Sequence, residues 1–168
     1  MFILKKVYCR IFQKVFRIAL PLLPYREPEI LESIELIPEV VVKNGCKKPI
    51  IVTDKGIVNL GLIDSLVEAL KKSEIPFAIY DETVPNPTTD NVAKAYDLYK
   101  KENCDCLIAF GGGSSMDCAK ALGVQIVYPK KTLGQLKGIL KVHKKLPLLI
   151  AIPTTAGTGS ETTLAAII

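Results

Sequence analysis

Short apolar segments alternate with amphipathic segments along most of the chain after residue 30. Apolar runs predict strands at residues 49–53, 77–80, 106–110 and 148–152. Between them, apolar residues at helical spacing predict helices at 36–44, 60–73, 91–103 and 114–123, with Asp90 as the expected N-cap of the third. Continuous apolar strands separated by helices indicate a parallel sheet covered on both faces. The predicted fold class is α/β: a doubly wound, mostly parallel, Rossmann-like sheet.

The first 28 residues follow a different pattern. Apolar residues recur at helical spacing, and the segment up to Arg26 carries six basic residues and no acidic one. These charges interrupt every apolar run before residue 18, so the pattern predicts neither a transmembrane span nor a signal peptide. We interpret 1–28 as a basic amphipathic helix with a Pro-rich linker, and 29–168 as one α/β domain. The helix either packs against a partner domain or lies on an anionic membrane.

Composition narrows the classes of function. The chain has 168 residues, of which 49% are hydrophobic, enough for one domain with a substantial core. The net charge of +5 comes from the N-terminal segment, and there is no Trp, so no nucleic-acid partner is expected. Five cysteines without a CxxC motif indicate reduced, buried thiols in a cytoplasmic protein, not a disulfide framework or zinc site. The single histidine, His143, excludes sites that need several.

One segment is strongly asymmetric in charge. From Cys118 to Ser160 there are seven lysines and no carboxylate. This segment is either a solvated helix and loop or a positive rim that favours an anionic ligand.

Candidate chemistry follows each predicted strand, because ligands of doubly wound folds bind beyond the carboxyl ends of the strands. Asp54, after the first strand, either bonds ribose hydroxyls or caps a turn. Asn86, between two prolines, either faces the cleft or belongs only to a rigid turn. The threonines of residues 153–160 (PTTAGTGS) either offer hydroxyls to a ligand or belong to a flexible polar loop.

The glycine-rich turn after the third strand carries the strongest signal. Gly111, Gly112 and Gly113 let backbone N–H groups approach a pyrophosphate, and the helix that follows directs its positive end at the anion. The alternative is a tight turn in which Ser114 is a simple N-cap. The spacing is neither GxGxxG nor the Walker pattern, so neither standard label applies.

Four segments, in this order, closely resemble the signatures of the iron-containing (group III) alcohol dehydrogenase family. They are residues 51–56 (IVTDKG), 84–88 (VPNPT), 111–120 (GGGSSMDCAK) and 152–161 (IPTTAGTGSE). The resemblance runs from about residue 34 to the last residue. Glycerol dehydrogenases and dehydroquinate synthases share a similar glycine turn, but the last segment favours the alcohol dehydrogenases.

The resemblance implies the cofactor-binding half of an NAD(P)-dependent alcohol dehydrogenase or aldehyde reductase. Its cofactor is NAD or NADP, with NAD favoured by an acidic residue near the adenosine ribose, and its substrate is a small alcohol or aldehyde. The cofactor-binding residues that it implies are Asp54, Asn86, Gly111, Gly112, Gly113, Ser114, Asp117, Thr154, Thr155 and Thr158. It also implies Fe²⁺ or another divalent metal, held in a helical C-terminal domain by one Asp and three His.

The chain departs from the family at that metal site. No catalytic or metal-binding residue is predicted within 1–168, because the ligands belong to the C-terminal domain and His143 cannot replace them. The chain is therefore interpreted as an excised domain, a truncated product or a fragment that meets its other half as a second chain. Alternatives are a glycerol dehydrogenase-like half or a non-catalytic nucleotide-binding module. A homodimer is an open alternative for its assembly.

Overall fold

The computed structural model describes residues 10, 14, 28–138, 141–163, 166 and 168. The chain divides into two units, residues 1–30 and 31–168, and the second holds all the strands described below. The interpretation of residues 1–28 as a basic amphipathic helix and linker concerns mainly residues outside the described part. No helix in that part has both the length and the apolar character that crossing a membrane would require.

Four parallel strands form one sheet, as the apolar runs predict. They are β1 (Pro49–Val52), β2 (Ala78–Tyr80), β3 (Cys106–Gly111) and β4 (Leu149–Pro153), in the order β2-β1-β3-β4. The register places Ile51 of β1 opposite Ile79 of β2 and Ile108 of β3. The two central strands are buried along their whole length, which is why they appear in the sequence as unbroken apolar runs.

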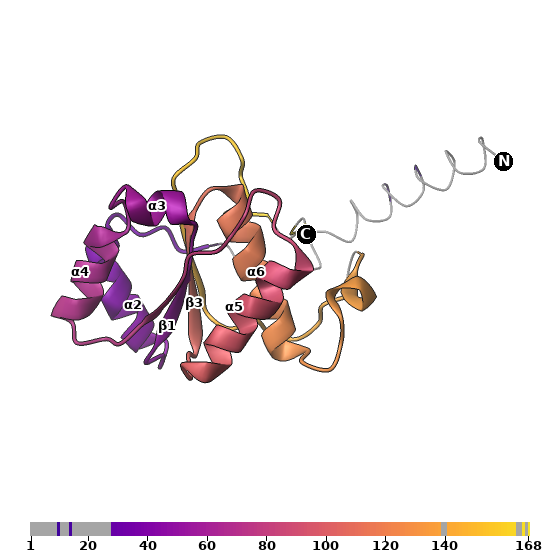
Figure 1. Cartoon of the computed structure of the whole chain (residues 1–168), viewed down its shortest axis with the longest axis horizontal. Coiled ribbons are helices and arrows are strands. Elements are labelled where there is room, and N and C mark those ends of the chain that lie inside the picture. Colours follow the sequence, from indigo (N-terminus) through magenta and orange to yellow (C-terminus); the bar gives the residue numbers. More distant parts are fainter. Residues whose placement is uncertain (1–9, 11–13, 15–27, 139–140, 164–165, 167) are drawn as a thin grey trace. The chain divides into compact units, whose positions relative to one another are not determined.

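Helices cover both faces of the sheet, as Figure 1 shows for α2, α3 and α4 on one side and α5 and α6 on the other. In chain order the helical elements are η2 (Ile34–Leu36), α2 (Ile37–Lys43), α3 (Lys55–Asn59), α4 (Asp64–Lys72), α5 (Thr89–Lys101), α6 (Gly113–Val127) and η3 (Leu133–Leu136). The fold is the predicted doubly wound α/β arrangement.

Two apolar cores lie between the sheet and these helices, one on each face of the sheet. Alternate side chains of β3 enter opposite cores: Leu107 packs with Met116 and Leu122 of α6, whereas Ile108 packs with Leu66 of α4. All five of these side chains are almost fully buried. This alternation follows from the two-residue period of a strand, and it fixes both helical layers to the same pair of central strands.

Two local predictions differ from the structure. The helix predicted over residues 60–73 begins only at Asp64, as α4, and the short helix α3 before it was not predicted. The two helices are separated at Gly61, which adopts a left-handed conformation (φ +66°). Its N–H donates to the carbonyl of Val58, and that of Leu62 donates to Ile57, which is the Schellman arrangement that ends α3. The N-cap of α5 is Thr88, not Asp90; its hydroxyl accepts from the Asn91 N–H in a capping box.

Candidate functional site

A cleft of about 970 Å³ opens at the carboxyl ends of the strands. From β1 the chain continues outward to β2, and from β3 it continues outward to β4, so the direction of winding reverses between the two central strands. In doubly wound sheets ligands bind at this reversal point. Asp54 leaves β1 there and the glycine turn leaves β3 there, so the topology itself brings the two predicted segments to one cleft.

The glycine turn forms the start of α6. Gly112 is the N-cap, and no side chain accepts a hydrogen bond from the first turn of the helix. The first intrahelical bond runs from the Met116 N–H to the Gly112 carbonyl. The N–H groups at the start of a fifteen-residue helix thus face the cleft without a side-chain cap, in the arrangement that accepts anions.

Side chains have almost no room on this turn. Gly111 has φ +144°, and a β-carbon on it would lie 2.5 Å from Ser115 Oγ. A β-carbon on Gly112 would come within 3.0 Å of Thr155 Oγ1, and one on Gly113 within 3.1 Å of Ser160 Oγ. A β-carbon would thus clash at Gly111 and would need a neighbouring hydroxyl to shift at Gly112 and Gly113. The glycines leave bare backbone along this turn, a cradle that matches a close approach to a pyrophosphate.

The polar loop of residues 153–163, which follows β4, lies against the glycine turn. The Thr154 N–H donates to the Gly111 carbonyl at 2.9 Å, so residues 154 and 155 are held beside the cradle as β4 ends. Lys120 of α6 fastens the far end of the loop: its Nζ donates to the Ser160 carbonyl and to Thr163 Oγ1. Burial lowers the pKa of the Lys120 ammonium, and nearby Asp117 opposes that change. Lys120 lies within the predicted glycine segment, but its anchoring role was not predicted.

Asp54 has the capping role that the sequence left open, and it also lies on the cleft wall. Its Oδ1 accepts from the Ile57 N–H at 3.1 Å and caps α3. The carboxylate also lines the cleft, and its Oδ2 lies 3.7 Å from where a Gly111 β-carbon would sit. One oxygen is thus used by the helix cap, and the other faces the glycine turn.

The loop after β2 is tied to the same turn. Asn86 adopts a left-handed conformation (φ +53°), and its N–H donates to Ser114 Oγ at 3.3 Å. Asn91 supports the loop from below, because its Nδ2 donates to the Glu82 carbonyl at 2.9 Å and to Tyr80 Oη at 3.3 Å. The three loops after β1, β2 and β3 therefore form one connected wall.

Six of the ten predicted residues line the cleft: Asp54, Gly112, Gly113, Ser114, Thr154 and Thr155. Gly111 lies just behind them, since its carbonyl holds Thr154. Asn86 contacts Ser114 through its backbone, and Thr158 lies close to Gly113 without lining the cleft. Asp117 is farther along α6 and is not among the lining residues.

The cleft wall contains charged residues that the sequence reading did not single out. Asp81, Glu82 and Asp90 join Asp54 on it, against the two lysines Lys55 and Lys94, and Lys94 already pairs with Glu82 and Asp90. None of the seven lysines from the 118–160 segment lines the cleft. The lysines of that segment are therefore not part of the cleft lining, where the positive groups are Lys55, Lys94 and the N–H groups at the start of α6.

The sheet, its two helical layers and the cleft at the reversal point define the class of protein, a doubly wound α/β domain with a glycine-lined ligand cleft. The family described as "Iron-containing alcohol dehydrogenase" matches residues 31–168. The chain belongs to this family.

Known relatives agree with this assignment. The chain is 43% identical over 132 residues to choline dehydrogenase of Bacillus subtilis (strain 168), covering 77% of this chain and 33% of the relative. It resembles a solved 1,3-propanediol oxidoreductase with a TM-score of 0.73 and 35% identity, covering 77% and 34% of the two chains. A sulfoacetaldehyde reductase of Bifidobacterium kashiwanohense, solved in complex with NAD⁺, gives a TM-score of 0.67 at 31% identity, with 77% and 34% coverage. The chain thus spans about a third of the length of these relatives.

The iron that the family name implies finds no matching set of ligands in this chain. The resemblance implies one Asp and three His, whereas the sequence has only His143. His143 is exposed on the segment after α6, where its backbone N–H donates to Tyr128 Oη. No reaction step through iron is therefore assigned to these residues.

Proposed function

We propose that this chain is the cofactor-binding part of an NAD(P)-dependent alcohol dehydrogenase or aldehyde reductase of the iron-containing type. The observation that carries the proposal is the start of α6, which has no side-chain cap and where Gly112 and Gly113 line a cleft at the reversal point of the sheet. Membership of the family supports it from an independent direction. When bound, the nicotinamide ring of such a cofactor accepts a hydride from an alcohol or donates one to an aldehyde.

In this proposal the pyrophosphate lies against Gly111–Gly113, where backbone N–H groups approach it without obstruction from a β-carbon. Ser114 holds the Asn86 loop in place beside it. Thr154 and Thr155 lie along the same stretch of the cofactor from the opposite loop. Asp117 and Thr158 do not line the cleft, so their place among the cofactor contacts rests on the family resemblance alone.

The proposal favours NAD over NADP. Asp54 faces the glycine turn with one carboxylate oxygen, which suits hydrogen bonds from the two ribose hydroxyls. A 2′-phosphate would meet repulsion from Asp54 and from Asp81 and Glu82, which also line the cleft. The NAD⁺ complex of the related sulfoacetaldehyde reductase supports this choice.

The remaining parts of the activity belong to the proposal as well. The substrate is a small alcohol or aldehyde, and the iron site lies outside the residues of this chain. The free cysteines of the described residues, three of which are buried, support a reducing compartment such as the cytoplasm. Assembly as a homodimer is consistent with β2 and β4 being sheet edges in the described part of the chain.

Calorimetric titration of the purified chain with NADH and with NADPH, without added metal, tests the proposal. Saturable binding, tighter for NADH, is the expected result. A chain that melts cooperatively but binds neither dinucleotide would contradict the proposal. Binding without turnover, even after a C-terminal metal-binding domain of the family is added, would favour a non-catalytic nucleotide-binding module instead.

A further inference from the structure

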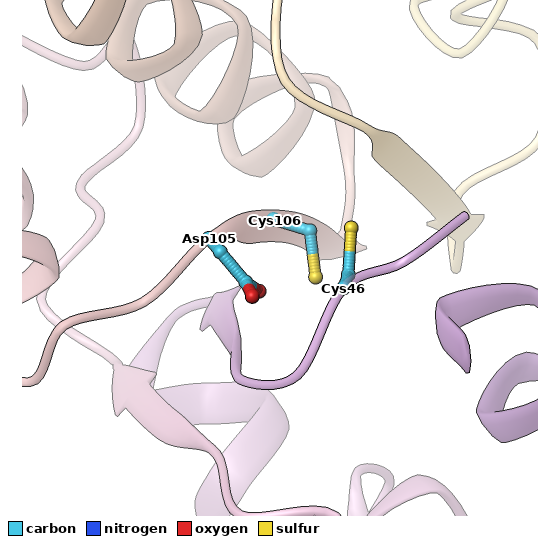
Figure 2. Close-up of side chains that lie close together, drawn as sticks. All are labelled: Cys46, Asp105 and Cys106. Carbon is cyan, nitrogen blue, oxygen red and sulfur yellow. The ribbon is translucent and has the colours of Figure 1, made fainter. Parts of the chain in front are cut away.

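A second group of chemically active side chains lies at the end of the sheet opposite the cleft. Cys46, Asp105 and Cys106 place two sulfurs and a carboxylate oxygen within 4.8 Å of one another, the one such group of metal-binding side chains in the described part of the chain. Figure 2 shows the Cys106 sulfur between the Asp105 carboxylate and the Cys46 sulfur. Cys106 begins β3, so the group is at the amino ends of the strands, away from the cofactor cleft.

Backbone hydrogen bonds hold the three residues together. The Cys46 N–H donates to the Val41 carbonyl at 3.0 Å, which fixes the turn between α2 and β1. The Asp105 N–H donates to the Lys48 carbonyl at 3.0 Å. In return the Asp105 carboxylate accepts from the N–H groups of Lys47 at 2.7 Å and Lys48 at 3.0 Å. The donor atoms are therefore positioned by the fold before any ligand arrives.

The three side chains form a compact donor set, in which the Cys106 side chain is fully buried and the other two lie nearer the surface. The nearby Lys48 ammonium pairs with Glu102 at 2.9 Å, so its charge is already engaged. A divalent ion would stabilise both thiolates and the carboxylate at once.

We propose that Cys46, Asp105 and Cys106 form a binding site for a thiophilic divalent cation of the zinc type. Two thiolates and a carboxylate are a donor set that Zn²⁺ prefers, with water as a fourth ligand. Tetrahedral coordination with Zn–S bonds of about 2.3 Å places two sulfurs about 3.8 Å apart, which lies within the observed spread of 4.8 Å. Asp105 is exposed and Cys46 is half-buried, so an ion can enter from solvent.

The site is separate from the iron of the family and from the cofactor cleft. Its ligands come from the turn before β1, from Asp105 directly before β3 and from Cys106, the first residue of β3. A bound ion would therefore join the two central strands where they begin. Binding would release the two thiol protons. This role is structural, and it does not depend on the proposed cofactor function.

Titration of the reduced chain with Co²⁺, a spectroscopic substitute for Zn²⁺, tests the site. Every sample carries Cys9→Ser, which removes a thiol outside the described residues. The expected result is a thiolate-to-cobalt charge-transfer band that saturates at one Co²⁺ per chain and disappears when Zn²⁺ is added. Absence of a thiolate band, or oxidation of Cys46 and Cys106 to a disulfide in place of binding, would overturn the proposal.

Matched variants locate the ligands. Cys46→Ser should weaken Co²⁺ binding at least about tenfold, because one of three protein ligands loses its thiolate. Cys104→Ala is the control, since Cys104 is also a free cysteine but packs in the core on the other face of the sheet. Circular dichroism and NADH titration of both variants report whether the fold is retained. Equal weakening in both, or none in a folded Cys46→Ser chain, would refute the assignment.

Discussion

At the scale of single residues, the cradle depends on positions where no β-carbon is present. Gly112 has an ordinary negative φ (−84°), so another residue can adopt its backbone conformation. Its β-carbon would nevertheless lie 3.0 Å from Thr155 Oγ1, in the space between the two loops. A substitution at Gly112 therefore tests whether the space beside this residue must stay empty, and it does not strain the backbone.

Gly112→Val should reduce NADH affinity at least about tenfold, or about 1.4 kcal/mol, because its methyl groups enter the space proposed for the pyrophosphate. Calorimetric titration measures the effect. Gly134→Val is the matched control, since Gly134 is exposed in η3 and a β-carbon there has only Thr132 Oγ1 nearby, at 3.9 Å. Unchanged NADH affinity in a folded Gly112→Val chain would remove the pyrophosphate from this turn.

Asp54 caps α3 and has a proposed role in the choice between NAD and NADP, and two substitutions can separate the two. Asp54→Ser retains a side-chain oxygen for the cap of α3 but removes the charge, so NADPH affinity should rise about tenfold relative to NADH while stability is kept. Asp54→Ala removes both and should also lower the free energy of unfolding by about 1 kcal/mol. Titration with both dinucleotides and urea unfolding measure the two effects. An unchanged NADH/NADPH ratio in Asp54→Ser would leave Asp54 as a helix cap only.

Some site residues could be predicted from residue type alone and others could not. Glycines directly after an apolar strand predict the cradle, because a residue without a side chain best allows a phosphate to approach the backbone. The placement of Asp117 and Thr158 off the cleft wall could not be predicted, since it depends on the rotation of α6 and the path of the 153–163 loop. Lys120 was missed because a lysine in a helix has no distinctive pattern until its partner, here the Ser160 carbonyl, is known.

At the scale of elements, α5 shows how one buried amide organises a loop. Asn91 is 6% exposed; it closes the capping box with Thr88 and also bonds Tyr80 Oη and the Glu82 carbonyl. The neighbouring Asp90 is exposed and makes only a surface pair with Lys94 at 3.4 Å. Asn91 thus holds α5 to the loop after β2, whereas Asp90 contributes only a contact at the surface.

Asn91→Ala should lower the free energy of unfolding by about 2 kcal/mol, because several buried polar groups lose their partner. Asp90→Ala should change it by less than about 0.5 kcal/mol, as expected for an exposed ion pair. Urea unfolding followed by circular dichroism compares the two. Equal losses would mean that Asp90, the N-cap expected from sequence, supports α5 after all.

Helix boundaries were the weaker part of the sequence prediction. Apolar spacing correctly marked the region of α4, but it does not register a left-handed residue such as Gly61, which separates α3 from α4. Thr88 and Asp90 are both acceptable N-caps by residue type. The choice between them depends on Asn91, whose other contacts lie in the β2 loop and are therefore tertiary.

At the scale of the whole molecule, the buried thiols make the folded state less stable at alkaline pH. Burial raises the pKa of Cys104 and of Cys118 from 9.0 to about 11, and raises that of Tyr99 from 10.0 to about 12. Above pH 9 the unfolded chain loses its thiol protons while the folded chain keeps them. The folded state is then the one that binds more protons, so its stability falls as the pH rises.

The free energy of unfolding should therefore decrease between about pH 9 and pH 11, by roughly 2–3 kcal/mol for each of the two thiols. Urea unfolding at a series of pH values measures the slope. Cys104→Ala should give a shallower decrease, because one of the buried groups that titrate in this range is gone. A free energy that stays constant over this range would show that the thiols titrate equally in both states.

The α/β class and the parallel sheet were predictable because buried central strands leave unbroken apolar runs. The strand order β2-β1-β3-β4 was not, since periodicity gives the faces of a strand but not its neighbours. The group of Cys46, Asp105 and Cys106 depends on that order, because only the pairing of β1 with β3 brings residues 46 and 106 together.

The same strand order constrains how the protein forms during synthesis. β1 can pair with β2 soon after both leave the ribosome, but its other edge waits for β3, which begins at Cys106. Until then Ile50, Ile51 and Val52, all fully buried in the finished sheet, have an open hydrogen-bonding edge. Unpaired apolar edges are sites of wrong association. Translation between β2 and β3 is therefore the interval in which a nascent chain most needs protection by a chaperone.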